Sequence, residues 1–401
     1  MELNFYDCMD YIKTHTGILD LASGDPFIPK TLKKAILASI HTLNKDVLIN
    51  VLSRYTQLDG IPSLKEKMLD LIFKEFGKSL STDEILITPG ANSALQYIQG
   101  TYLNPKSKVL FPLAYEYPGV FPAYPDGVIL GSPNYFQDDD FSEEGYAFLE
   151  TLPWDEIKLV ILSVPNNPTG FVLNEKVLKY ISQKLSLSSG FLILDKTYAF
   201  PLLPLTHKLI PFMAGGNIVE IYSFSKIGLA SERVGIIFAD KQIIRRLSQA
   251  LRKNLIQSPK IGQFLALNLI KHLELPAVYY KEVSIQHYKN NWMHCKTAFE
   301  NKTNLKNLCT IYSWGGGPFL FLTLNCSYSH EKIIFEALLK NKIAIMPGSC
   351  FLQKSSFHKN FIQFSPSFRL GLGIKADCFK QGVVFLTDFL ENYFKTKFNY
   401  S

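Results

Sequence analysis

Lys226 lies in a short polar segment that could bind an anion and attack a carbonyl carbon. The segment runs from Ser223 to Gly235 and contains a second hydroxyl at Ser225 and an arginine at Arg233, directly after the apolar run Ile218–Tyr222. Two hydroxyls and an arginine suit a dianionic phosphate, and a lysine amine is a nucleophile toward aldehydes and ketones. A Ser/Lys segment of this kind is weakly diagnostic by itself, so its meaning depends on its neighbours.

Two other apolar runs end in residues that suit a ligand. After Ile85–Thr88, the glycine of the segment Pro89–Ser93 precedes a predicted helix, whose free N–H groups attract anions. An ordinary helix start is the simpler interpretation of that glycine. After Leu159–Ser163 comes a turn rich in Pro and Asn, which holds the amide of Asn167 where it can hydrogen-bond a ligand oxygen.

A third run, Phe191–Leu194, ends in a carboxylate. Asp195 follows it directly, and Tyr198 comes three residues later. A carboxylate at the end of a buried strand is costly unless it has a partner, and a protonated ring nitrogen would be one. The alternative is an aspartate that caps a nearby loop.

The elements that must position these residues alternate between strands and helices. Unbroken apolar strands separated by amphipathic helices are typical of a mostly parallel sheet with helices on both faces. In such a sheet, ligands bind at the carboxyl ends of the strands, where the polar segments lie. The expected strands are Ile85–Thr88, Val109–Phe111, Leu159–Ser163, Phe191–Leu194, Ile218–Tyr222 and Val234–Phe238, and the expected helices between them include Ser63–Phe76, Ser93–Tyr102 and Glu175–Leu187.

The pattern changes after Phe238. A long helical tract is followed by a shorter region of mixed elements, which predicts a second, smaller α/β domain. We expect a large domain over residues 46–285 and a discontinuous small domain over residues 1–45 and 286–401. The elements expected here are helical segments at Lys241–His272, Val278–Glu300, His330–Lys340 and the C-terminal end to about Lys397, with strands at Pro318–Leu324, Ile343–Met346 and Phe368–Leu370.

Composition excludes several classes of protein. The 401 residues are 47% hydrophobic, with 42 Lys and Arg against 35 Asp and Glu, so the excess of +7 is too dilute to demand a nucleic-acid partner. Six cysteines without a Cys-x-x-Cys pair indicate free thiols in a reducing compartment. His287 and His294 lack a third metal ligand, so no metal site is expected. Because no signal peptide and no membrane span are recognisable in the sequence, we expect a soluble, cytoplasmic protein.

The four strand-end segments, in this order, resemble the fold-type I pyridoxal-phosphate (PLP) aminotransferases of class I/II. The resemblance runs over nearly the whole chain, from Leu21–Pro26 through Arg54–Lys65 to Phe368–Gly371. It implies the PLP-dependent transferase fold and PLP as cofactor. Three stretches look specifically like the valine-pyruvate aminotransferases, including the spacing of seven residues from Lys226 to Arg233; they are Lys108–Tyr117, Ser225–Ala239 and Ile345–Gly348.

The resemblance implies a role for each cofactor residue. Lys226 would form the Schiff base with PLP and shuttle the proton, Asp195 would pair with the ring nitrogen, and Asn167 with Tyr198 would bond the ring 3′-oxygen. Tyr117 would stack on the ring, with Tyr115 as the alternative. The phosphate would be held by Gly90, Ala91, Asn92, Ser223, Ser225 and Arg233, and by Tyr55 of a neighbouring subunit.

The resemblance also implies the substrate contacts and the assembly. Arg369 would hold the substrate α-carboxylate, with Gly24 and Asn167 nearby. A Tyr55 that reaches across implies a homodimer with shared active sites. The expected activity is ping-pong transamination between a valine- or alanine-like amino acid and a 2-oxo acid such as pyruvate.

Three alternatives to that activity stay open. The same residues would serve a β-eliminating lyase of the cysteine-S-conjugate type or an aminocyclopropane-carboxylate synthase. They would also serve an aminotransferase of other specificity. A PLP-binding regulatory or structural protein without turnover is a further alternative.

Overall fold

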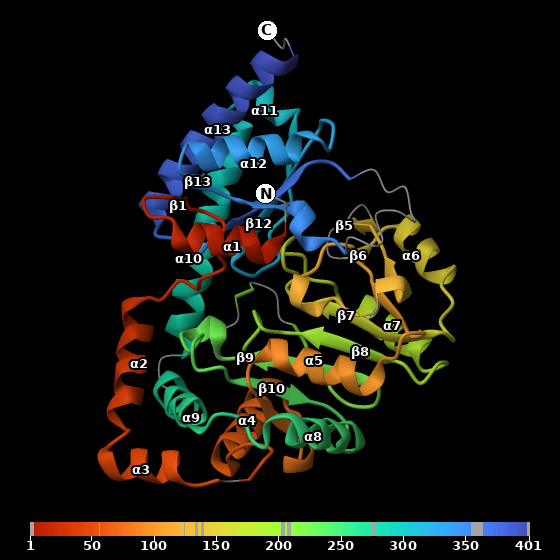
Figure 1. Cartoon of the computed structure of the whole chain (residues 1–401), viewed down its shortest axis with the longest axis vertical. Helices are drawn as coiled ribbons and strands as arrows, with labels where there is room; N and C mark the ends of the chain where they lie inside the picture. The colour runs from red at the N-terminus through yellow and green to blue at the C-terminus, as the bar shows by residue number, and fades with distance from the viewer. Residues whose placement is uncertain are drawn as a thin grey trace.

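A computed structural model describes residues 4–55, 57–123, 125–132, 135–137, 140–201, 205–206, 210–274, 277–353 and 364–398. The chain forms two adjoining α/β bodies (Figure 1). The larger body is built on a seven-stranded sheet, and the smaller one on a four-stranded sheet. This arrangement agrees with the fold class expected from the sequence.

The large sheet is parallel except for one strand. Its spatial order is β2-β10-β9-β8-β7-β3-β4, and β10 runs antiparallel to both of its neighbours. All six strands predicted here are present, whereas β4 was not predicted because three half-buried residues at a sheet edge carry no recognisable period. The strands are β2 (Ile85–Thr88), β3 (Lys108–Phe111), β4 (Val128–Leu130), β7 (Ile157–Ser163), β8 (Phe191–Asp195), β9 (Ile218–Ser223) and β10 (Gly235–Phe238).

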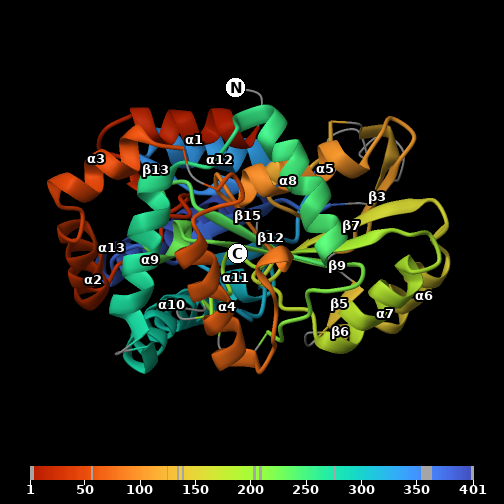
Figure 2. The same ribbon diagram turned by 90° about the horizontal axis from the view of Figure 1, so that it is seen from below.

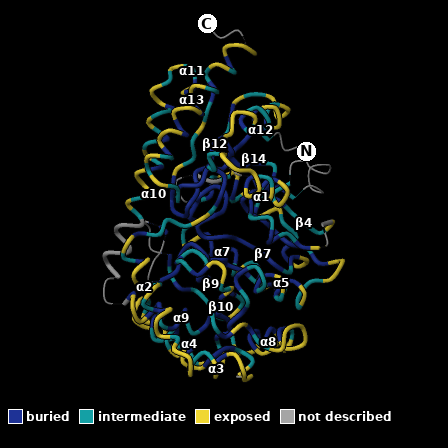
Figure 3. Tube along the Cα trace, turned by 60° about the vertical axis from the view of Figure 1, so that its left-hand side comes forward, coloured by how far each residue is buried: buried dark blue, intermediate teal, exposed yellow. Residues whose placement is uncertain are grey.

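Helices cover both faces of this sheet. Successive apolar side chains of a strand point to opposite faces, so both faces must be buried. Leu86, Leu159 and Ile161 join the core cluster that contains the apolar side chains of α5 (Ala91–Tyr102) and α8 (Lys241–Leu255). The neighbouring residues Ile85 and Ile87 pack instead with α4 (Pro62–Phe76) and α9 (Lys260–Glu274), and further strand residues of this second face pack with α7 (Glu175–Leu185). Figure 3 shows the strands as a buried centre and the outer sides of the helices as exposed.

The small body contains an antiparallel sheet of order β11-β12-β15-β14. Its strands are β11 (Cys309–Ile311), β12 (Phe319–Leu324), β14 (Met346–Pro347) and β15 (Ser367–Gly371), and its helices are α10 (Ala277–Glu300), α11 (Thr303–Lys306), α12 (His330–Lys340) and α13 (Ala376–Phe398). The single strand expected at Ile343–Met346 is two strands: β13 (Ile343–Ala344) pairs with β1 (Leu19–Asp20), and β14 pairs with β15. The segment that contains Leu19–Asp20 therefore joins the small body.

The helical tract after Phe238 is divided into α8, α9 and α10. The first break lies at Ile256, which has a positive φ of 67°, shortly before Pro259. In a continuous helix the Pro259 ring would clash with the carbonyl four residues earlier, that of Leu255, where α8 ends. The expected boundary between residues 285 and 286 falls inside α10, and the division into domains stays a prediction.

Three N-terminal helices complete the fold: α1 (Phe5–Thr14), α2 (Lys30–His41) and α3 (Lys45–Ser53). Helix α1 lies at the junction of the two bodies, whereas α2 and α3 lie at one edge beside α9 (Figures 1 and 2). Across the described ranges, no single helix is long and apolar enough to cross a membrane; only α2 and α3 together, bent by 77°, have the required length and composition. The remaining elements are β5 (Phe136–Gln137), β6 (Asp140–Phe141) and α6 (Glu143–Glu150).

Candidate active site

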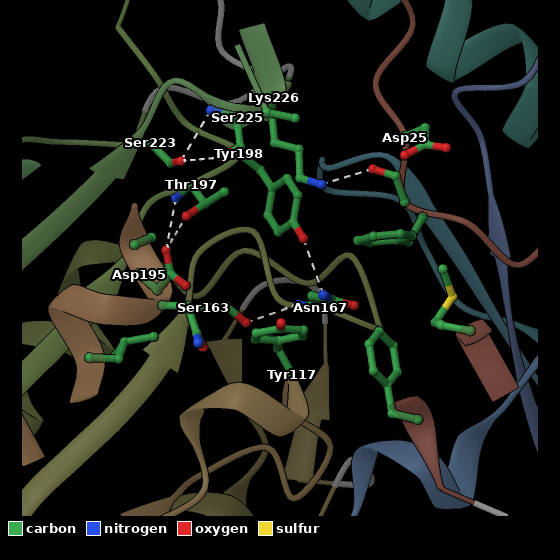
Figure 4. A pocket seen from close by; sticks show the side chains of 18 of the residues that line it. Asp25, Tyr117, Ser163, Asn167, Asp195, Thr197, Tyr198, Ser223, Ser225 and Lys226 are labelled. Atoms are coloured by element: carbon green, nitrogen blue, oxygen red, sulfur yellow. Dashed lines mark hydrogen bonds between the residues drawn. The ribbon is translucent and has the colours of Figure 1, made fainter. Parts of the chain in front are cut away.

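A cavity of about 290 Å³ lies where the two bodies meet. Its floor is the carboxyl ends of β7, β8 and β9, and its other walls come from α1, the start of α5 and strands β12 and β15 of the small sheet. Figure 4 shows ten of the lining residues converging on it. The sequence-predicted residues in its lining are Gly24, Ala91, Asn92, Tyr117, Asn167, Asp195, Tyr198, Ser223, Ser225, Lys226, Arg233 and Arg369.

One end of the cavity is a cluster of hydroxyls and one cation. Ser223, the last residue of β9, donates from Oγ to Oγ of Ser225 at 3.0 Å. Arg233 donates from Nη1 to the same Ser225 oxygen at 3.3 Å and to the Ala230 carbonyl at 3.0 Å. The backbone of Arg233 has a φ of 53°, which is uncommon for a residue with a side chain and often occurs at functional sites.

Helix α5 begins at the same end. Its N-cap is Gly90, with a φ of 88°, and no side chain caps the first N–H groups. A Cβ at Gly90 would lie 2.2 Å from Nη2 of Arg233, so only glycine lets this arginine lie against the helix start. Oδ1 of Asn92 is buried and has no partner within the described residues. Uncapped N–H groups, an arginine and hydroxyls together make a site for a phosphate dianion.

Lys226 reaches the middle of the cavity from the short helical turn η5 (Ser225–Ile227). Its Nζ donates to the Gly24 carbonyl at 2.9 Å, and lies 5.8 Å from the centre of the Tyr198 ring. Burial, followed by repulsion from Arg369, lowers the pKa of this amine to about 8. A buried lysine with a lowered pKa exposes a neutral, nucleophilic amine near neutral pH.

Asp195 faces the cavity at the end of β8. Its Oδ1 accepts hydrogen bonds from the backbone N–H and the hydroxyl of Thr197, which leaves Oδ2 for a donor in the cavity. Burial raises the pKa of Asp195, an effect that these hydrogen bonds and the charge of Lys226 oppose. The next residue, Lys196, points away and forms a fully buried ion pair with Glu220.

Asn167 connects the two bodies. Its Nδ2 donates to the Tyr198 hydroxyl at 3.1 Å, and its Oδ1 accepts from Nη1 of Arg369 at 2.9 Å. Arg369 comes from β15 of the small sheet, and its Nη2 donates to the Ala22 carbonyl at 2.7 Å. The residues predicted to touch cofactor and substrate are therefore joined by hydrogen bonds.

Arg369 is held among aromatic rings. The centres of Phe319 and Phe351 lie 4.0 Å and 4.7 Å from its Cζ, and Phe5 lies at 5.7 Å. Burial lowers the pKa of the guanidinium to about 10, so it stays charged at neutral pH. Its Nε is buried and has no partner in the described part of the chain. A charged, partly unsatisfied guanidinium at a cavity wall is suited to an incoming carboxylate.

Tyr117 lines the cavity and Tyr115 does not. The Tyr115 ring is buried against Phe321 of the small sheet, and its hydroxyl lies 3.4 Å from Oγ of Ser367. Of the two candidates for the stacking ring, the geometry therefore favours Tyr117.

Gly24 and Tyr55 differ in their placement. Gly24 is adjacent to the cavity, and a Cβ there would lie 2.7 Å from the Phe319 ring. Its carbonyl bonds Lys226, whereas the sequence resemblance placed it near the substrate carboxylate. Tyr55 is 76% exposed and is not among the residues that line the cavity of its own chain.

Sequence reasoning missed several lining residues: Phe5, Met9, Asp25, Leu95, Ser163, Thr197, Ala230 and Phe319. Thr197 could have been found, because it lies between two predicted site residues. Phe5 and Met9 could not, because α1 has the composition of an ordinary amphipathic helix. Only the tertiary structure brings that helix to the cavity.

The cavity has the donors and acceptors that PLP needs. The phosphate dianion matches the donors of Ser223, Ser225, Arg233 and the uncapped N–H groups at the start of α5. A buried carboxylate at Asp195 can pair with a protonated pyridine nitrogen, and Tyr117 offers an aromatic ring. The fold and this site together define a PLP-dependent enzyme of the aminotransferase type.

Comparisons with known proteins agree. The family model "Aminotransferase class I and II" matches residues 16–370, so the chain belongs to that family, and its cofactor is pyridoxal 5′-phosphate. The chain is 24% identical over 354 residues to valine–pyruvate aminotransferase of Escherichia coli, covering 86% of this chain and 84% of the relative. It is also 24% identical over 357 residues to aspartate aminotransferase of Thermotoga maritima, covering 87% and 88%. A crystal structure of valine–pyruvate aminotransferase from Salmonella typhimurium superimposes with a TM-score of 0.80 at 19% identity, covering 97% and 99% of the two chains, which shows the fold.

Proposed function

We propose that this aminotransferase moves the amino group between an aliphatic, valine- or alanine-like L-amino acid and a 2-oxo acid such as pyruvate. The observation that carries the proposal is the distribution of charge in the cavity. Three described cations line it, Lys226, Arg233 and Arg369. Lys226 is needed for the cofactor aldehyde and Arg233 for the phosphate, so Arg369 remains for one substrate carboxylate.

The surroundings of Arg369 favour an apolar substrate side chain. Phe5 and Met9 of α1 and Phe319 of β12 line the same cavity. Asp25 also lines it, but its carboxylate is largely exposed and paired with Lys13 at 2.8 Å, so it offers no donor to a second substrate carboxylate. A dicarboxylic substrate would therefore bury a carboxylate without a partner among the described residues of this chain, which is costly. The comparisons alone do not select a substrate, because valine–pyruvate and aspartate aminotransferases are equally similar in sequence.

The residues of the chain divide the work of such a reaction. PLP, when bound, supplies an aldehyde and an electron-accepting ring. Arg369 binds the substrate α-carboxylate with its planar guanidinium, and Asp195 keeps the ring nitrogen protonated. Lys226, as a neutral amine, would carry the proton from the substrate Cα to the cofactor carbon in one half-reaction and in the opposite direction in the other.

The proposal includes a homodimer in which Tyr55 completes the partner's phosphate site. An exposed apolar surface supports it: Leu37 and Ile40 of α2, and Ile49 and Leu52 of α3, are all about half exposed or more, beside the exposed Tyr55. Contiguous apolar surface of this kind marks an interface. Location in the cytoplasm stays a prediction.

A panel of amino donors tests the proposal. Valine, alanine and aspartate would each be assayed with pyruvate, oxaloacetate and 2-oxoglutarate as acceptors, except for alanine with pyruvate and aspartate with oxaloacetate, where products and reactants are identical. We expect kcat/KM for valine to exceed that for aspartate by at least about tenfold, because one unpaired buried carboxylate costs more than 1.4 kcal/mol. A preference for aspartate would contradict the substrate class. Ammonia release from a β-substituted alanine faster than amino transfer would indicate the elimination lyase instead.

A further inference from the structure

Glu116 is a fully buried carboxylate beside the cofactor cavity, with no role in the function proposed above. It lies on the loop after β3, immediately before Tyr117, and its side chain is 0% exposed. The carboxylate accepts three hydrogen bonds: from the backbone N–H of Ser163 at 3.0 Å, from the Ser163 hydroxyl at 2.6 Å and from Nδ2 of Asn166 at 2.8 Å. Such a group is retained only where its partners compensate for the lost water.

The partners of Glu116 belong to the turn that presents Asn167. Oγ of Ser163 accepts a hydrogen bond from the backbone N–H of Asn167 at 2.9 Å, so Ser163 bridges Glu116 and Asn167. Figure 4 shows Ser163, Asn167 and Tyr117 lying close together at the cavity wall. The backbone N–H of Glu116 donates to the Phe351 carbonyl at 3.0 Å, and Phe351 packs on Arg369. Glu116 thus links the loop that carries Tyr117, the turn that carries Asn167 and, through its backbone, the segment of Phe351 that packs on Arg369.

The charge of Glu116 depends on pH near neutrality. Burial raises its pKa to about 8, and the Asp195 carboxylate at the end of β8 adds to this rise, whereas hydrogen bonds from Ser163 and Tyr117 oppose it. Asp195, at the end of β8, is the charged group that raises the pKa of Glu116. The hydrogen-bond partners Ser163 and Asn166, from β7 and the loop after it, are neutral. Near neutral pH both protonation states are therefore accessible to this side chain.

The two states require different orientations of the Ser163 hydroxyl. When Glu116 is ionised, the hydroxyl donates to Oε2 and accepts from Asn167. When Glu116 carries a proton on Oε2, its O–H donates to Oγ of Ser163, and the Ser163 proton must turn elsewhere. Ser163 lines the cavity, so the cavity is the direction open to it.

We propose that Glu116 is a positioning residue of the cofactor cavity: it holds the turn that presents Asn167, and its proton decides whether the Ser163 hydroxyl donates to Glu116 or into the cavity. This inference concerns cofactor binding, and it stands whichever amino acid the enzyme accepts.

Three variants test it in the PLP-loaded enzyme: Glu116→Gln, Ser163→Ala and the double variant. The glutamine amide imitates protonated Glu116, because it donates to Oγ of Ser163. We expect each single variant to shift the pH midpoint of the bound cofactor's absorbance by at least about half a pH unit and to weaken PLP binding by about tenfold. Because Glu116 acts through Ser163, the double variant should show no more than the larger single effect. Additive effects, or single variants with the wild-type midpoint, would overturn the proposal.

Glu331→Gln is the matched control for a buried carboxylate. Glu331 is also buried, accepts from the backbone N–H groups of Ser349 and Ser367, and burial raises its pKa to about 7. Unlike Ser163, the partner of Glu116, neither Ser349 nor Ser367 lines the cavity. We expect it to leave the absorbance midpoint unchanged. An equal shift in this control would assign the effect to lost stability and overturn the proposal.

The apoprotein gives a readout that does not need the cofactor. The folded pKa of Glu116 lies above its ordinary value of 4.5, so the folded state binds more protons between these pH values, and stability falls as pH rises from about 4.5 to 8. Thermal unfolding of Glu116→Gln apoprotein should show a flatter decline over this range, and Ser163→Ala should keep the decline. An equally steep decline in Glu116→Gln would contradict the assigned charge change. If Glu116→Gln does not fold, the shift of the absorbance midpoint in Ser163→Ala still decides whether the proposal holds.

Discussion

Arg369 donates from Nη1 to Oδ1 of Asn167 across 2.9 Å and 202 positions of the chain. Asn167 in turn bonds the Tyr198 hydroxyl. The hydrogen bonds therefore run from the arginine predicted to bind substrate, through one amide, to the tyrosine predicted to bond the cofactor ring. A substrate carboxylate that engages Arg369 would compete for a donor that Asn167 uses, so substrate binding and cofactor contacts are coupled through this amide.

The first prediction concerns Arg369→Lys. A lysine cannot form the bidentate contact, and losing a hydrogen bond between charged groups costs about 1.5–3 kcal/mol, so KM for amino and oxo acids should rise by about 10- to 150-fold. PLP should stay bound, and its dissociation constant should change much less than KM, because Arg369 reaches the predicted cofactor contacts only through Asn167. The measurement is steady-state kinetics with a cofactor titration, and Arg252→Lys, an arginine on α8 paired with Asp59, is the control. An unchanged KM in Arg369→Lys would remove the substrate role.

The second prediction concerns the pH dependence of Lys226. Its lowered pKa of about 8 means that the amine is half neutral near pH 8, and that the neutral fraction rises through this pH and levels off above it. The rate at which apoprotein reacts with PLP, followed by absorbance, should rise over the same range and reach a plateau.

Lys226→Ala should fold but lose at least about 10²-fold in kcat, because the proton-transfer group is gone. Lys253→Ala, on exposed α8, should behave as wild type; activity retained by Lys226→Ala would refute the mechanism.

The third prediction compares two glycines of the same region. Gly90→Ala places a Cβ 2.2 Å from Nη2 of Arg233 at a φ of 88°, so the arginine must move or the helix start must shift. A strain of about 1–3 kcal/mol should weaken PLP binding by about tenfold or more. Gly100→Ala, in the interior of α5 with no atom within 4 Å of the new Cβ, should raise stability by about 0.5–1 kcal/mol. Fluorescence titration with PLP and thermal unfolding separate the two; equal PLP affinities would contradict the role of Gly90.

The fourth prediction tests the shared active site. If Tyr55 serves the partner's site, a hybrid dimer of one Lys226→Ala chain and one Tyr55→Ala chain contains one complete site. Mixing the two inactive or weakened variants under exchange conditions should therefore restore activity, because each supplies what the other lacks. Analytical ultracentrifugation would show the dimer. Mixing Lys226→Ala with Asp195→Ala is the control: both residues belong to the cavity of one chain, so each site of the hybrid keeps one defect and activity should not be restored. A monomer, or no recovery in the Tyr55 mixture, would refute the contribution of Tyr55.

The strand-end residues could be predicted because they follow a strong local pattern. Parallel strands buried on both faces are unbroken apolar runs, so their carboxyl ends, and Asp195, Ser223 and Asn167 with them, could be located in the sequence. The short strands β4 and β11 could not, since three residues have no period. Tyr115 and Tyr117 could not be distinguished, because both lie in the loop after β3, which ends at Phe111. Ala114 turns the chain there with a φ of 62°, so no strand alternation orients the two rings.

The sequence by itself determined the order of the elements, the chemical groups at the strand ends and, through their resemblance, the family. Local periodicity and residue type carry that information. Only the tertiary structure decided that α1 lines the cavity with Phe5 and Met9, that Arg369 meets Asn167, and that Glu116 is buried against Ser163. The contacts of α1 and Arg369 depend on how the small body packs on the large one, and that of Glu116 depends on the pairing of β3 with β7. Packing between distant segments leaves no repeat or spacing that can be read along the chain.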